Sequence, residues 1–159
     1  MRTTPDICDD FPNDIRILAP IFKSYGAISH FGGQVITVKC YEDNSFIKSL
    51  SAEQGNRRIL VVDGGGSLKK ALLGDLIAAD FVSHGWAGVV IHGCVRDVEI
   101  LKTLPLGIRA VNSIPLKTAR KGQGEQGIPL CIAGVTVNTG DYMVADDTGI
   151  VVSDQPIHL

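Results

Sequence analysis

Three charged residues, Asp75, Arg96 and Asp97, have the types and spacing of a site for a charged ligand. Arg96 and Asp97 follow the apolar run 88–91 closely, and α/β folds expose catalytic groups at the carboxyl ends of such strands. Twenty residues lie between Asp75 and Arg96, the length of one helix and one strand, so the chain can return beside its starting point. By itself, the Arg-Asp pair is more simply explained as a helix beginning at Asp97 next to a solvated arginine. Convergence with Asp75 is what would make it a site.

The segment that carries Asp75 predicts a helix over 74–84. One longer helix from Ser67 is the alternative, but an internal glycine at Gly74 would cost about 1 kcal/mol relative to alanine. A helix that begins at Gly74 or Asp75 places an acid at the positive end of its dipole and ends at Gly85. Its first turn, Gly74, Asp75, Leu76 and Ile77, then offers unpaired backbone N–H groups to a carboxylate or a phosphate.

Short β-rich runs bounded by Gly, Asp, Asn or Pro alternate with helical patterns in the first half of the chain. Helices are expected at about 43–54, 74–84 and 97–103. The last three strands follow one another with only turns between them, which predicts an α/β first half and an antiparallel second half. The expected strands are 34–40, 58–63, 87–93, 107–111, 133–137, 142–145 and 149–153.

Length and composition predict one domain over residues 1–159. The net charge is −2, and the only notable basic run is 117–121, so direct nucleic-acid binding is not expected. No apolar stretch is long enough to span a membrane, and the start of the chain is acidic and polar, which predicts a cytoplasmic protein. The four cysteines are far apart and the four histidines form no metal-binding pattern, so reduced thiols and no structural zinc are expected.

Two further motifs have simpler explanations than the chemistry they suggest. Gly64, Gly65 and Gly66 follow a strand, but their spacing fits neither a phosphate-binding loop nor a dinucleotide fingerprint, so a tight turn is expected. Asp147, Thr148 and Gly149 spell the tripeptide of aspartic proteases, which would need a second copy of the chain. A hairpin turn between two strands is the preferred interpretation.

The spacing from Asp75 to Arg96 and Asp97 resembles the D-x20-R-D motif of pyruvate-specific class II aldolases that cleave 4-hydroxy-4-methyl-2-oxoglutarate. Similarity extends over nearly the whole chain and includes the segments 31–44, 60–78, 85–99 and 145–153. These segments resemble a family that contains both the aldolases and the regulator of ribonuclease E activity A.

The resemblance implies a compact α/β domain related to the swivelling phosphohistidine domains, and a homotrimer with sites near the subunit boundaries. It also implies a divalent cation, Mg²⁺ or Mn²⁺, held by Asp97. Arg96 would contact the oxygens of a small α-keto acid, the backbone of 74–77 would receive the substrate carboxylate, and Asp75 would orient a water or a proton. A hard oxygen ligand and an always-charged guanidinium suit these roles.

The expected activity is metal-dependent aldol cleavage to pyruvate, with oxaloacetate decarboxylation through the same enolate. The alternative is a non-catalytic regulator that binds and inhibits ribonuclease E. Longer aldolases of the family add a C-terminal acid to a neighbouring subunit's site, and this chain, ending at Leu159, has no evident counterpart. Asp97, which we expect a pure regulator to have lost, is present.

Overall fold

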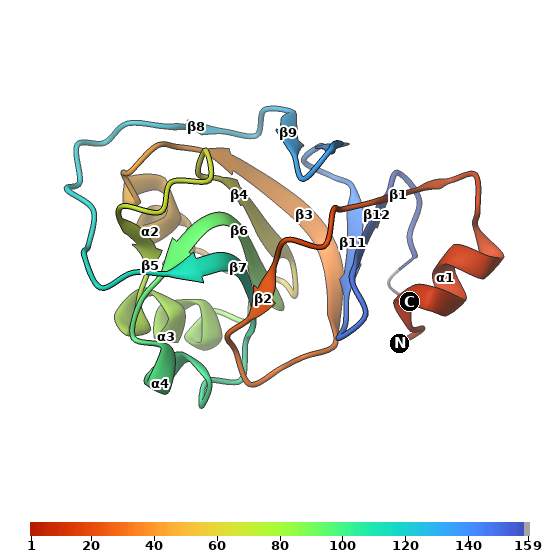
Figure 1. Ribbon diagram of the computed structural model, residues 1–159, viewed down its shortest axis with the longest axis horizontal. Helices are drawn as coiled ribbons and strands as arrows, with labels where there is room; N and C mark the ends of the chain where they lie inside the picture. The colour runs from red at the N-terminus through yellow and green to blue at the C-terminus, as the bar shows by residue number, and fades with distance from the viewer. Residues whose placement is uncertain (158–159) are drawn as a thin grey trace.

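Parallel strands in the first half of the chain form the centre of one mixed sheet, described for residues 1–157 by a computed structural model (Figure 1). β3, β4, β6 and β7 lie side by side and parallel, and β5 joins the far end of β6. The ten strands of this sheet are β1 (Ile15–Ile17), β2 (Lys23–Ser24), β3 (Phe31–Lys39), β4 (Ile59–Asp63), β5 (Ala71–Leu73), β6 (Gly88–Val95), β7 (Gly107–Ser113), β8 (Glu125–Gln126), β11 (Tyr142–Ala145) and β12 (Ile150–Ser153).

The antiparallel part of the sheet is built mostly from the second half of the chain. β11 pairs with β3 and with β12, and β1 closes that edge by pairing with β12. A separate two-stranded sheet contains β9 (Leu130–Ile132) and β10 (Val135–Val137). The predicted α/β class with an antiparallel C-terminal part is confirmed as a mixed sheet. The relation to the swivelling phosphohistidine domains stays a prediction.

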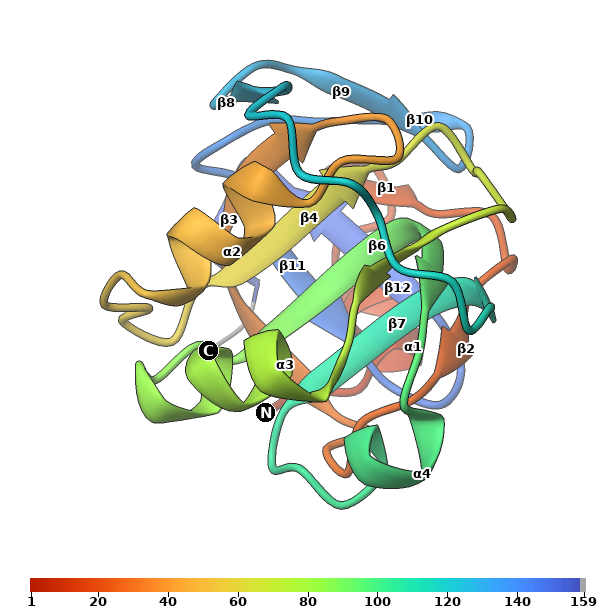
Figure 2. The same ribbon diagram turned by 90° about the vertical axis from the view of Figure 1, so that its left-hand side faces the viewer.

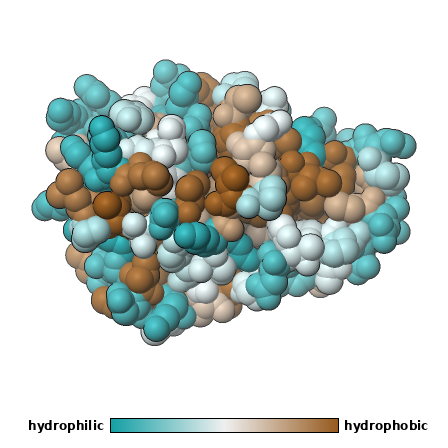
Figure 3. Space-filling model, in the orientation of Figure 1, coloured by the Kyte–Doolittle hydropathy of each residue, from teal (hydrophilic) through white to brown (hydrophobic). Residues whose placement is uncertain are grey.

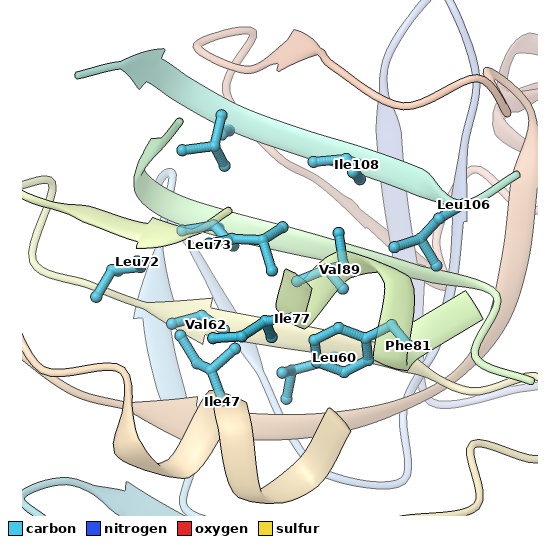
Figure 4. Packing of buried hydrophobic residues seen from close by; sticks show 14 of the residues in the cluster. Ile47, Leu60, Val62, Leu72, Leu73, Ile77, Phe81, Val89, Leu106 and Ile108 are labelled. Atoms are coloured by element: carbon cyan, nitrogen blue, oxygen red, sulfur yellow. The ribbon is translucent and has the colours of Figure 1, made fainter. Parts of the chain in front are cut away.

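Alternation along the central strands divides the core into two layers. On β4, Leu60 and Val62 pack on one face with α2 (Ser45–Ser51) and α3 (Asp75–Ser83), as Figures 2 and 4 show. Ile59 and Val61 face the other way, toward β9 to β12. Because both faces are buried, these strands appear in the sequence as continuous apolar runs.

The outer face of the antiparallel part is covered by α1 (Thr4–Asp10). This helix is not among those expected from the sequence. Ile7 of α1 packs with Val144 and Val151, and the helix lies at the opposite end of the molecule from α2 and α3 (Figure 1). Thr3 caps the helix, and its side chain accepts a hydrogen bond from the backbone of Asp6. The remaining helix, α4 (Val98–Leu101), is a single turn after β6.

Four segments differ from expectation. Residues 71–73, left outside the chosen helix, form β5, whose strand pairing with β6 could not be seen locally. The run 133–137 contributes only β10, and it pairs with β9 instead of joining β11. The helices expected at 43–54 and 97–103 are shorter, at Ser45–Ser51 and Val98–Leu101.

Candidate active site

The start of α3 is where the shorter predicted helix placed it. Gly74 is the N-cap with extended backbone, and α3 runs from Asp75 to Ser83. A Cβ on Gly74 would lie 2.7 Å from Asp97 Oδ2 and 3.3 Å from Arg96 Nε. A side chain at this position would therefore push the Asp97 carboxylate away from the helix start and shift the Arg96 side chain.

The pairing of β5 with β6 brings Arg96 and Asp97 to this helix start. Leu73 is in register with Val95, and the Arg96 N–H donates to the Leu73 carbonyl at 2.9 Å. The predicted excursion through one helix and one strand does return the chain to its starting point. Arg96 and Asp97 remain partly open to solvent, with side chains 38% and 34% exposed.

Asp97 adopts a left-handed conformation, with φ 56° and ψ 41°. Such a backbone is uncommon for residues other than glycine, although aspartate tolerates it better than most. Asp97 is the N-cap of α4 yet makes no side-chain cap to that helix. Its Oδ2 accepts the Asp75 N–H of α3 at 3.1 Å and lies 3.9 Å from Arg96 Nε. The strained turn thus directs the carboxylate toward α3.

Two backbone N–H groups of the predicted anion cradle, residues 74–77, are already bonded to side-chain carboxylates. Asp97 takes the Asp75 N–H, and Asp75 Oδ1 takes the Leu76 N–H at 2.9 Å. The Leu76 side chain is 78% exposed, whereas Ile77 is only 6% exposed and packs in the core. A ligand carboxylate bound to these first N–H groups would have to displace Asp75 or Asp97 from them. This geometry does not test the predicted cradle, but it sets that condition.

A cavity of about 440 Å³ opens beside the helix start. Its walls hold three cationic side chains, Arg96, Lys117 and Arg120, and one acid, Asp75. Asp97 borders a neighbouring pocket of about 210 Å³, and Arg96 lines both. The predicted residues Gly74, Asp75, Leu76, Ile77 and Arg96 all line the larger cavity, and Asp97 lies at its edge.

Sequence reasoning missed the residues that form the opposite wall, which are Asn44, Lys117, Thr118 and Arg120. In the sequence, the basic run 117–121 suggests only a possible nucleic-acid contact. Asn44 Oδ1 accepts from Thr118 Oγ1 at 2.9 Å and from Arg120 Nε at 3.1 Å, so the wall is bonded to the N-terminus of α2. The signal was the basic run itself, but its place opposite Arg96 depends on the fold.

The two other motifs are turns. Gly65 and Gly66 have positive φ, and Gly65 donates to Asp63 Oδ1 at 2.9 Å. The segment Asp146 to Gly149 joins β11 to β12, closed by the Asp146 N–H on the Gly149 carbonyl at 3.0 Å. The hairpin interpretation of the Asp-Thr-Gly tripeptide is confirmed.

Within residues 1–157, no helix is long and apolar enough to cross a membrane. The same part of the chain contains no cluster of three or more His, Cys, Asp or Glu side chains placed to hold a metal ion. A magnesium ion does not need such a cluster, because it commonly binds through one or two carboxylates and completes its shell with water and substrate oxygens. The donor set of Asp97, with Asp75 beside it, fits that pattern.

Comparison with known proteins gives three different names. A candidate 4-hydroxy-4-methyl-2-oxoglutarate aldolase from Pseudomonas fluorescens (strain Pf0-1) is 45% identical over 98% of this chain and 96% of its own length. The solved structure of the RNA-processing inhibitor RraA from Thermus thermophilus is 40% identical, with a TM-score of 0.95 over 98% of this chain and 94% of that one. A structure described as S-adenosylmethionine:2-dimethylmenaquinone methyltransferase, from Geobacillus kaustophilus HTA426, is 36% identical, with a TM-score of 0.96 over 98% and 97%.

The family model described as RraA-like, Aldolase/RraA, matches residues 4–152. That range contains every residue of the cavity and both strands that position Arg96 and Asp97. Together with the full-length relatives, this match shows that the chain belongs to the RraA-like (Aldolase/RraA) family.

Proposed function

We propose that this protein is a divalent-metal-dependent aldolase that cleaves 4-hydroxy-4-methyl-2-oxoglutarate to pyruvate, with oxaloacetate decarboxylation as a side activity. The observation that carries the proposal is the meeting of Asp75, Arg96 and Asp97 around Gly74, at the edge of a cavity with cationic walls. The names of the related aldolases support it.

The cavity suits a short dianion. Arg96 follows β6, which pairs with β5, and Lys117 forms a bridge to Ala71 of β5, so two separate segments bring cations to the cavity. We propose that a substrate with a carboxylate at each end is bound by both. A guanidinium binds a planar carboxylate in a two-pronged geometry, which fixes orientation as well as charge. In this arrangement Arg96 holds the α-keto acid end and the 117–120 wall holds the far carboxylate.

Asp97 is the residue that would hold the metal, because its carboxylate stays partly open beside Arg96. When bound, a divalent cation supplies a Lewis acid that stabilises the enolate charge of pyruvate by several kcal/mol. The hydrogen bond from the Asp75 N–H to the Asp97 carboxylate also keeps the two acidic residues adjacent. This arrangement suits a site that binds a cation and transfers a proton.

Asp75 is the proposed proton acceptor. Its Oδ1 is held by the Leu76 N–H, so the carboxylate has a fixed direction at the cavity wall. Asp75, directly or through one water, takes the proton of the C4 hydroxyl, and the C3–C4 bond breaks. The bond's electron pair moves to C3 to form the enolate of one pyruvate, while C4 becomes the carbonyl carbon of a second. Return of a proton to C3 completes the reaction.

Methyl transfer from S-adenosylmethionine is a poorer match to this cavity. That cofactor carries a sulfonium cation, and three cationic side chains line the walls. Like charges brought together in a partly desolvated site repel each other.

Ribonuclease inhibition is a second candidate function, favoured by the likeness to the Thermus RraA structure. Inhibition would use an outer surface rather than the cavity, so the two functions can coexist.

Assembly as a homotrimer is also proposed. Leu76 at the cavity and Leu116 next to its wall are 78% and 57% exposed, and an apolar band crosses the face seen in Figure 3. Sedimentation of the intact chain as a monomer would contradict the trimer.

The test of the main proposal is pyruvate release from 4-hydroxy-4-methyl-2-oxoglutarate and from oxaloacetate, with chelator and with added Mg²⁺ or Mn²⁺. We expect turnover to stop in chelator and to return with metal. Inhibition of ribonuclease E by the same preparation is measured in parallel. Chelator-resistant cleavage would contradict the mechanism, and inhibition without any cleavage would favour the second function.

A further inference from the structure

The cationic wall of the cavity is an irregular segment between β7 and β8, which we call the strap and define as residues 116–123. It runs along the outside of the sheet from β7 toward β8 (Figures 1 and 2). Near its start the Leu116 carbonyl accepts the Ala71 N–H of β5 at 2.7 Å. Beyond the isolated bridge between Lys117 and Ala71, no regular structure holds the strap, so other contacts must fix the direction of Arg120.

Those contacts converge on a buried acid just before α2. Asp43 is 3% exposed, and its Oδ2 accepts the backbone N–H groups of Lys121 at 2.8 Å and of Gln123 at 3.2 Å. Its Oδ1 accepts the Ser45 N–H and hydroxyl at 2.9 and 2.6 Å, and the Ser45 hydroxyl in turn accepts the Gly122 N–H at 3.0 Å. Three successive N–H groups of the strap therefore point at one carboxylate and its partner hydroxyl, as in an anion-binding nest.

The next residue connects this anchor to the cavity. Asn44 accepts from Thr118 and from Arg120 Nε, and its own amide donates to the Leu72 carbonyl at 3.1 Å. Asp43 thus holds the far end of the strap while Asn44 orients the guanidinium carried in its middle. Burial alone would raise the pKa of Asp43, but the hydrogen bonds from Ser45, Lys121 and Gln123 outweigh it and lower the pKa to about 2. The anchor is ionised at any pH at which the protein would act.

We propose that Asp43 is a positioning residue, which fixes the strap so that Arg120 can bind the far carboxylate of a dicarboxylic α-keto acid. The inference rests on the proposed function for its substrate class, and it assigns a role to a residue that does not itself line the cavity. Asp43→Asn is the informative change. In one orientation of the asparagine amide, its NH₂ group would face the N–H groups of Lys121 and Gln123, donor against donor. In the other orientation, Ser45 would lose its acceptor.

The probe is 2-oxoglutarate, a dicarboxylic α-keto acid that lacks the C4 hydroxyl and so cannot be cleaved. Its binding is measured by calorimetry, with Mg²⁺ present, for the wild type, Asp43→Asn, Arg120→Gln and the double variant. We expect each single change to raise Kd about three- to tenfold and the double variant to be no weaker than Arg120→Gln, because coupled residues are not additive. Ser45→Ala, which removes the hydroxyl shared with Gly122, should weaken binding in the same direction.

Asp141→Asn is the matched control. Asp141 is also a buried aspartate, bonded to the Asn138 N–H and to Arg16 at 2.8 Å each, but it is remote from the cavity. It should lower the melting temperature without changing Kd. Unchanged binding by both Asp43→Asn and Ser45→Ala, or losses that multiply in the double variant, would overturn the proposal, as would a wild type that does not bind 2-oxoglutarate. Binding that behaves as expected without any aldol cleavage would contradict the proposed function and leave the role of Asp43 standing.

Discussion

Two aspartates, each in a turn after a strand of the large sheet, accept the first backbone N–H of a helix. Asp146, in the turn between β11 and β12, accepts the Thr4 N–H of α1 at 2.7 Å, and Asp97, after β6, accepts the Asp75 N–H of α3 at 3.1 Å. Asp146 also accepts the Thr4 hydroxyl and the N–H groups of Thr148 and Gly149. Asp97, in contrast, has this one hydrogen bond and a 3.9 Å approach of Arg96 within residues 1–157.

The two carboxylates differ in how many of their acceptor positions are occupied within the protein. A carboxylate has about four acceptor positions. Those of Asp146 are taken up by docking α1 onto the hairpin, so nothing is left for a ligand. Asp97 keeps most of its acceptor positions free, has a left-handed backbone and is partly exposed, and these features support its proposed role as a metal ligand.

The largest expected effect comes from removing the Asp97 carboxylate, most of whose acceptor positions are free. Asp97→Ala should lower kcat/KM for oxaloacetate by at least about 100-fold, or about 2.7 kcal/mol, because the residue that would hold the cation is gone. Added Mg²⁺ or Mn²⁺ should not restore turnover. Steady-state kinetics checks the first statement, and a melting curve within a few degrees of wild type would show that the fold survives. Full activity of Asp97→Ala would remove Asp97 from the mechanism.

Removing the Asp146 carboxylate, whose acceptor positions are occupied, should lower stability and leave activity nearly unchanged. Asp146→Ala leaves the Thr4, Thr148 and Gly149 donors without their acceptor and loosens α1, so unfolding should become easier by about 2–3 kcal/mol. Urea denaturation measures this change. Activity at low temperature, where the variant is still folded, should stay within about twofold of wild type. A large loss of kcat/KM in a folded variant would show that the hairpin end belongs to the site.

Sequence alone could predict the meeting of Asp75, Arg96 and Asp97 because it depends on short-range regularities. One helix and one strand have predictable lengths, and Gly74 marks the point at which the helix begins. The apolar runs of β4 and β6 were equally readable, since burial on both faces leaves polar residues only toward their carboxyl ends, at Asp63 and His92.

The parts that sequence reasoning missed depend on contacts between distant segments. Lys117 and Arg120 look like surface charges until the strap is tied to Asp43 and Asn44, more than 70 positions earlier. β5 is only three residues long and exists because β6 lies beside it. For α1 the sequence does contain a local signal, since Thr3 with Pro5 and Asp6 is a typical helix start.

A smaller effect tests whether Arg96 belongs with Asp97 or with a protein interface. Arg96→Lys keeps the charge but loses the planar two-pronged contact, so kcat/KM for oxaloacetate should fall about tenfold, equal to about 1.4 kcal/mol. Inhibition of ribonuclease E, measured on the same preparation, should not change. If turnover were unaffected and inhibition were lost, the Arg-Asp pair would be part of a docking surface instead.

The smallest effect concerns acid and sharpens the comparison from the structural side. Burial alone would raise the pKa of Asp146, but hydrogen bonds from Thr4, Thr148 and Gly149 outweigh it and lower the pKa below its usual value of 3.8. A group whose pKa is lower in the folded than in the unfolded protein stabilises the fold above the unfolded pKa, and this contribution is lost as the pH falls through the folded pKa. Wild type should therefore exceed Asp146→Asn in unfolding free energy by more at pH 7 than at pH 3, as measured by urea denaturation at both values. Asp43 loses stabilising charge in acid too, but it is present in both proteins and cancels in the difference. An equal advantage at the two pH values would mean that the Asp146 hydrogen bonds do not depend on its charge, and the contrast with Asp97 would then rest on hydrogen-bond capacity alone.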